Sequence, residues 1–125
     1  MPDFTEMDLM QFFDRHPREL ALCQAFLQRV LDTCPDTQLR VHKTQITLQN
    51  RHGFAFVSLP RHKVSEPTIV ISFGLSHRLS SPRIWQAAEP YPNRWTHHVL
   101  VSDEGQLDAE LLGWVQEAAV FAATK

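Results

Sequence analysis

Apolar residues recur at helical spacing in three parts of the chain. Thr5 is of a helix-capping type, and residues 6–14 after it carry apolar side chains on one side. Pro17 suits the first turn of a second helix, 17–33, because the amide hydrogen that proline lacks would have no helical partner there. Residues 107–123 again place their apolar side chains on one face. The pattern therefore predicts two N-terminal helices and one C-terminal helix.

The middle of the chain changes to the pattern of β-strands. Polar and apolar residues alternate over residues 38–43 and 45–49, as they do in strands with one buried face. Residues 53–59 and 68–75 are apolar on both sides, and the last predicted strand spans 94–101. The connections are short and contain turn-forming residues, which favours antiparallel pairing.

This order of elements predicts one α+β domain covering residues 1–125. Since each helix has one apolar face, we expect all three helices on one face of an antiparallel sheet of four to six strands. The other face of the sheet would then contact water or a partner. No segment approaches the roughly 20 apolar residues of a membrane span, and the first residues lack a signal-peptide pattern. We therefore expect a cytoplasmic protein that does not contact a membrane.

The cysteines and the loops give no sign of a bound metal or cofactor. Cys23 and Cys34 lie on the second predicted helix, where their spacing of eleven residues corresponds to about 16 Å. A disulfide needs about 7 Å or less between Cα atoms, so the two cannot pair. The sequence has no CxxC motif, no spaced set of Cys and His ligands and no glycine-rich phosphate loop. We therefore predict no metal site and no cofactor.

Charge is divided unevenly along the chain, although the net charge is only −2. Residues 1–37 and residues 102–125 each carry a net charge of −4. Residues 38–101 carry +6, from eight Lys and Arg and two acids, and also hold six of the seven histidines. The predicted sheet is thus basic and the predicted helices are acidic. Either the sheet attracts an anionic ligand, a nucleic acid or an acidic partner, or the helix acids balance its charge within the molecule.

Two adjacent histidines are candidates for a site in this basic segment. His97 and His98 point to opposite faces of the last predicted strand, so they cannot both bind one metal ion without a bulge. One is expected to pack in the core, and the other to lie on the open side of the sheet. There it could bind an anion beside Arg94 or act as a general acid or base. Lys43 and Arg51 flank the first predicted hairpin and are either phosphate contacts or solvated charges.

Arg83 and Glu89 have competing interpretations. Arg83 lies in a loop two residues before Trp85, and it could stack on that ring or bind a ligand. Glu89 is one of two acids in the segment, and we expect it to pair with Arg83 or Arg94. Ser72 is interpreted as a small packing residue. Without a recognisable nucleophile or paired carboxylates, the sequence leans against an enzyme.

Several short strings, taken together, are similar to a known family. They are Lys43–Ile46, Phe54–Ala55, Leu59–Pro60, Ser72–Phe73, Arg83–Ile84, Arg94–His98, Leu107–Asp108 and Trp114. With them the chain resembles, over residues 12–119, a bacterial family described only as domain of unknown function 5655. The resemblance implies a small α+β domain and no established chemistry. The family's recurring polar positions match Lys43, Gln45, Arg83, Arg94, His97 and His98.

We therefore expect a binding module whose basic sheet side takes an anionic small molecule or an acidic protein partner. The candidate ligand-binding residues are Lys43, Gln45, Arg51, Arg83, Arg94, His97 and His98. If an anion binds, Lys43, Arg83, Arg94 and one of the histidines should converge on one concavity. The alternative is a protein-interaction or homodimerisation domain that uses the open sheet face and takes no small molecule. Nucleic acid is disfavoured because the isoelectric point is near 6.4.

Overall fold

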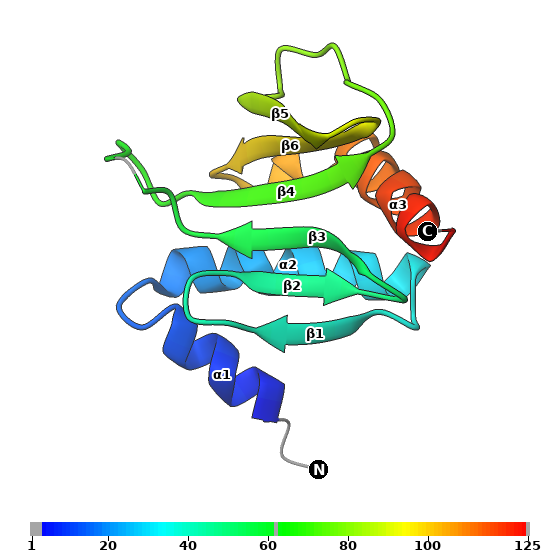
Figure 1. The fold of residues 1–125 in the computed structure, drawn as a ribbon. Coiled ribbons are helices and arrows are strands. Elements are labelled where there is room, and N and C mark those ends of the chain that lie inside the picture. The colour runs from blue at the N-terminus through cyan, green and yellow to red at the C-terminus, as the bar shows by residue number, and fades with distance from the viewer. Residues whose placement is uncertain (1–3, 62, 125) are drawn as a thin grey trace.

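The computed structural model describes residues 4–61 and 63–124. This part of the chain forms two N-terminal helices, six strands and a C-terminal helix (Figure 1). Its elements are α1 (Phe4–Phe12), α2 (Pro17–Thr33), β1 (Gln38–Val41), β2 (Ile46–Gln49), β3 (Gly53–Ser58), β4 (Ile69–Leu75), β5 (Gln86–Tyr91), β6 (Arg94–Val101), the short 3-10 helix η1 (Glu104–Gln106) and α3 (Ala109–Ala123).

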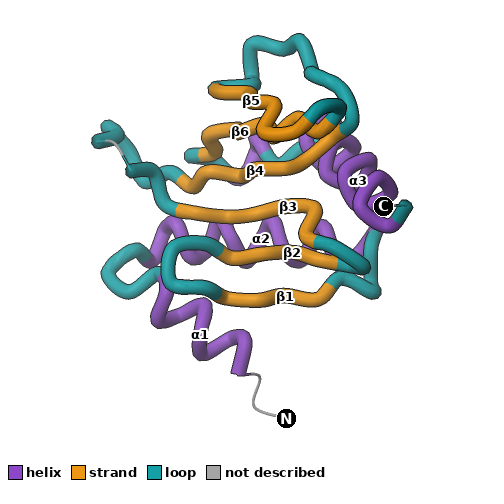
Figure 2. Tube along the Cα trace, in the orientation of Figure 1, coloured by secondary structure: helices purple, strands orange, loops and turns teal. Residues whose placement is uncertain are grey.

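The six described strands form one antiparallel sheet in the order β1-β2-β3-β4-β6-β5. The helices cover one face of this sheet, and the side chains buried between the two layers make one core (Figures 1 and 2). The predicted α+β architecture, with all three helices on one face of an antiparallel sheet, is confirmed. None of the helices within residues 4–61 and 63–124 is long and apolar enough to cross a membrane.

Strand register decides which side chains enter the core, because successive strand residues point to opposite faces. Leu48, Ala55, Phe73 and His97 are paired neighbours across β2, β3, β4 and β6, and all four are fully buried under the helices. The residue next to each points to the side without helices, which we call the open face. One row of paired residues crosses the open face from edge to edge: Arg40, Thr47, Phe56, Ser72, His98 and Gln86.

Three details differ from the sequence prediction. Helix α1 begins at Phe4 and ends at Phe12, and the side chain of Thr5, the predicted cap, lies outside the described residues. The C-terminal helix begins at Ala109, because the Asp108 carboxylate accepts the Leu111 amide hydrogen at 3.1 Å and so caps the first turn. Strand β5 was not predicted. It lies at the edge of the sheet, and most of its residues are exposed, so it has no alternating apolar pattern.

Both cysteines are free. Cys23 lies in the core on α2, and its burial raises the pKa of the thiol to about 12, which keeps it protonated at neutral pH. Cys34 is half-buried at the C-terminal end of α2.

Candidate functional site

The open face contains a pocket of about 480 Å³ over the middle of the sheet. This volume is within the range of small-molecule sites in proteins. We call it the open-face pocket; its lining residues are Thr44, Gln45, Phe56, Ser58, Leu59, Pro60, Arg61, Val70, Ser72, Trp85, Gln86, Thr96 and His98. They come from β3, β4, β5 and β6, from the turn before β2, from the loop after β3 and, for Trp85, from the loop before β5.

A serine and a histidine form a pair in this pocket. Ser72 on β4 and His98 on β6 are directly paired across the sheet, and Ser72 Oγ lies 2.6 Å from His98 Nδ1. This distance is that of a strong hydrogen bond, whose direction depends on the tautomer of the ring. Burial lowers the pKa of His98 below its usual value, so the imidazole is neutral at pH 7. The hydroxyl group fixes the orientation of a neutral ring.

The lining of the open-face pocket combines polar, aromatic and basic groups. The Gln45 amide donates a long hydrogen bond of 3.4 Å to Thr47 Oγ1, and Gln86 is the cross-strand neighbour of His98. Trp85 is 46% exposed. Arg61 is exposed and supplies a fixed positive charge. Of the described residues that line the pocket, none carries a carboxylate. Its electrostatic character is therefore neutral to positive.

His97 occupies the opposite side of the same strand. It is fully buried, stacks on Phe73 with ring centroids 5.2 Å apart, and accepts the Leu79 amide hydrogen at Nε2 over 2.9 Å. Nδ1 is buried without a well-formed hydrogen bond to any described residue. Burial lowers the pKa of His97, and the nearby backbone of Phe73 opposes this effect in part. The prediction that one histidine packs in the core while the other faces the open side is confirmed, with His98 on the open side.

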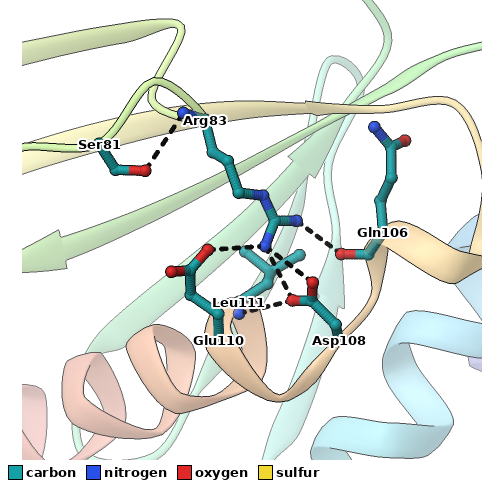
Figure 3. A network of polar contacts seen from close by, with 6 residues as sticks. All are labelled: Ser81, Arg83, Gln106, Asp108, Glu110 and Leu111. Atoms are coloured by element: carbon teal, nitrogen blue, oxygen red, sulfur yellow. Dashed lines mark hydrogen bonds and ion pairs between the residues drawn. The ribbon is translucent and has the colours of Figure 1, made fainter.

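Arg83 lies outside the open-face pocket and is paired with acids at the start of α3 (Figure 3). Its guanidinium donates to both carboxylate oxygens of Asp108, at 2.8 and 3.1 Å, and to Glu110 at 3.0 Å. It also donates to the Gln106 carbonyl at 2.7 Å and lies 5.9 Å above the Trp114 ring. The carboxylates of Asp108 and Glu110 raise the pKa of Arg83, and the hydrogen bond from Arg83 is the main cause that lowers the pKa of Asp108. Arg83 holds the loop before β5 to the start of α3.

The predicted partners of Arg83 are therefore corrected. Glu89 is not its ion-pair partner: one Glu89 carboxylate oxygen accepts the Asn93 amide hydrogen at 3.1 Å. The ring under Arg83 is Trp114 of α3. The physical reason is that Asp108 and Glu110 lie at the start of α3, in the first turn and its cap, where negative charge is favoured. Arg83 meets two carboxylates there.

The predicted convergence of Lys43, Arg83, Arg94 and one histidine on one concavity is wrong. Lys43 is exposed in the turn between β1 and β2, beside the end of the sheet where β6 finishes. Arg94 begins β6, which has 8 residues and is roughly 25 Å long. Arg94 lines a different cavity, of about 200 Å³, at the other end of the sheet. Arg51 is exposed in the β2–β3 turn at that same end.

Of the predicted ligand-binding residues, only Gln45 and His98 line the open-face pocket; Lys43 precedes its lining residue Thr44. Sequence reasoning missed Ser72 and Arg61. Ser72 could be recognised only from the pairing of β4 with β6, because nothing in its own neighbourhood indicates a site. No group of three or more His, Cys, Asp or Glu in the described residues could hold a metal ion.

These features define a class of small α+β domain in which a one-sided helical layer supports a sheet with a pocket on its exposed face. The chain matches the family described as domain of unknown function (DUF5655) over residues 10–121, which is most of its length, and it belongs to that family. The resemblance found in the sequence is thereby confirmed. No curated protein and no solved structure matches the chain.

Proposed function

We propose that this domain binds a small anionic molecule in the open-face pocket. The observation that carries the proposal is the composition of the lining: Arg61 and His98 are its titratable or charged groups among the described residues, and no carboxylate opposes an anion there. An anion entering the pocket therefore meets one guanidinium and one histidine.

The remaining lining residues suit an organic anion with a polar framework. Gln45 and Gln86 bring side-chain amides that can both donate and accept hydrogen bonds. Phe56 and Trp85 offer apolar ring surface on the same pocket. A few polar groups among apolar walls is the usual composition of a small-molecule site.

The test is a binding titration followed residue by residue. Isotope-labelled protein is titrated with sulfate, phosphate, phenyl phosphate and benzoate while amide chemical shifts are recorded. We expect saturable shifts concentrated on Gln45, Ser72 and His98, and weaker binding for Arg61→Gln. Arg51→Gln is the matched control, because it removes a guanidinium from the other end of the sheet and should leave binding unchanged.

Scattered shifts, or equal loss in the two arginine variants, would contradict the proposal and point to a nonspecific charge effect. The competing function is homodimerisation or protein interaction through the open face, where Phe56, Val70 and Trp85 provide apolar contact area. Sedimentation analysis separates the two. A dimer that dissociates on Phe56→Ser substitution, with no binding of any anion, would favour the interaction domain.

A further inference from the structure

We propose that the ligand's anionic group is an oxyanion held directly by the Ser72–His98 pair, and that the protein takes up one proton when this group binds. The inference rests on the proposed function and specifies its chemistry. Carboxylate, phosphate and sulfate share the required feature, which is two or more acceptor oxygens on one centre. The proposal makes His98 the proton-linked residue of the site.

Geometry decides which atom of His98 meets the ligand. Ser72 Oγ, at 2.6 Å, occupies Nδ1. Nε2 is the remaining ring nitrogen, and no described residue is hydrogen-bonded to it while the ring lines the pocket. A ligand that contacts His98 through a polar atom must therefore do so at Nε2. For an oxyanion, Nε2 must carry a hydrogen.

The hydroxyl group of Ser72 lets the pair change its hydrogen-bond direction. With neutral His98 protonated at Nε2, the hydroxyl donates to Nδ1 and its hydrogen is engaged in that bond. With protonated His98, Nδ1–H donates to Ser72 Oγ instead, and the hydroxyl hydrogen is released to point into the pocket. The protonated pair thus offers two donors, Nε2–H and Oγ–H, to two oxygens of one oxyanion. The neutral pair offers one.

The surroundings explain why protonation should accompany binding. Burial disfavours the imidazolium form of His98, and Arg61, the basic residue among the described pocket lining, cannot compensate its charge. The residues paired with His98 across the sheet, Ser72 of β4 and Gln86 of β5, are uncharged, and Phe56 lies beyond Ser72 on β3. His97, the other titratable group nearby on β6, points into the core.

No carboxylate is therefore available among the described lining residues to compensate an imidazolium. A bound oxyanion supplies the missing opposite charge within hydrogen-bonding distance. Since binding and protonation each favour the other, the affinity must rise as the pH falls through the range in which free His98 is neutral and bound His98 is charged.

Sulfate is the probe of choice because it remains a dianion between pH 5.5 and 8, so any proton uptake belongs to the protein. Titration calorimetry is run at several pH values and, at each pH, in two buffers of different ionisation enthalpy, which gives the number of protons bound. We expect uptake approaching one proton and an affinity that increases by up to about tenfold per pH unit on acidification. Phenyl phosphate and benzoate, titrated in parallel, distinguish a phosphate ligand from a carboxylate ligand.

Three variants test the assignment. His98→Gln keeps a polar side chain that cannot titrate, and sulfate affinity should become nearly independent of pH. Ser72→Ala removes the second donor, and should weaken binding at pH 5.5 more than at pH 8. His52→Gln is the control, because His52 is exposed in the β2–β3 turn outside the pocket, and it should retain the full pH dependence.

The outcomes separate this proposal from the proposed function. Sulfate binding at the pocket with no proton uptake, or with uptake that persists in His98→Gln, would overturn the proton-linked assignment while leaving anion binding in place. No binding of any probe at any pH would overturn both proposals. Loss of pH dependence in His52→Gln would assign the linked proton to a surface histidine and would also overturn the proposal.

Discussion

The ion-pair network of Arg83 allows a double-mutant cycle that tests how the loop before β5 is held to α3. Arg83→Met removes the charge and keeps an unbranched apolar stem above the Trp114 ring. Asp108→Asn removes the partner charge, and asparagine is an equally good helix cap, so the hydrogen bond to the Leu111 amide is retained. The cycle therefore isolates the charge interaction from the packing and the capping.

The magnitude follows from the exposure of the partners. The Arg83 side chain is 25% exposed, and those of Asp108 and Glu110 are 47% and 55% exposed, so water screens both ion pairs. An exposed pair contributes about 0.2–1 kcal/mol, and an exposed cation–π contact about 0.5–1 kcal/mol. We expect Arg83→Met to lower the free energy of unfolding by about 1–2 kcal/mol. The coupling between Arg83 and Asp108 should be about 0.5–1 kcal/mol, at the upper end for a screened pair, because the Arg83 side chain is mostly buried and one of its nitrogens contacts both Asp108 oxygens.

Urea denaturation at pH 7 measures all four corners of the cycle, with equal m-values as the check for two-state unfolding. The coupling should shrink in 1 M NaCl. Arg83 is the main cause of the lowered pKa of Asp108, so the stabilisation is present above the unfolded value of about 3.9 and is lost as the pH falls through the folded value. Arg83→Met should therefore flatten the loss of stability below pH 4.

Arg29 and Glu104 provide a matched control. They form one ion pair of 3.0 Å with side chains 36% and 64% exposed, and Arg29 contacts only one carboxylate oxygen of Glu104. The same cycle there should give a coupling near zero. A coupling below about 0.2 kcal/mol for Arg83 and Asp108, or one no larger than that of the control pair, would refute the claim that Arg83 holds the loop.

Three further predictions concern the core and the cysteines. Because the folded pKa of His97 lies below the unfolded value of about 6.5, stability should fall as the pH drops below 6.5. His97→Phe should weaken this pH dependence. It should also lower the free energy of unfolding at pH 7 by about 1–3 kcal/mol, because the Leu79 amide loses its acceptor. An unchanged pH profile in urea titrations would show that His97 is not the cause of the pH dependence. Trp114→Ala should lower the free energy of unfolding by about 3 kcal/mol, because the half-buried ring stacks on Phe73 of the core. A loss below about 1 kcal/mol would mean that α3 does not pack on the sheet through Trp114. Iodoacetamide should modify Cys34 in the folded protein and Cys23 only after unfolding, which peptide mass spectrometry distinguishes.

The layered fold could be predicted because the periodicity of apolar residues is a local property of the sequence. Each helix needs one apolar face, which recurs at helical spacing in the sequence. In β3 and β4 the core residues Val57, Ile71 and Phe73 have apolar or small neighbours, so both strands could be recognised as runs of such residues. Strand β5 could not be predicted in the same way. Only its pairing with β6 holds it in the sheet, and its sequence, which includes Pro90, has no apolar alternation because the strand is an exposed edge.

The site could be predicted only in part, because it depends on register. The period of two along β6 was enough to place His97 and His98 on opposite faces. It could not place Ser72 opposite His98, since the two residues are 26 positions apart and their pairing is fixed by the whole β4–β6 ladder. Counting charges also overestimated the number of available cations. Arg83 lies in the basic segment, yet two acids of the C-terminal segment neutralise it.

The neutralisation of Arg83 distinguishes the helical side of the sheet from the open face. The acids that balance Arg83 belong to the helical layer, and they act on the side of the sheet that carries the core (Figure 3). Among the described residues that line the open-face pocket there is no such acid to pair with Arg61, and burial lowers the pKa of the half-buried His98 ring. Ion pairs within the chain thus neutralise Arg83 at the helical layer. The described residues of the open-face pocket include no carboxylate that could neutralise Arg61 in the same way. This contrast supports the proposal that the open-face pocket takes an anion from outside the chain.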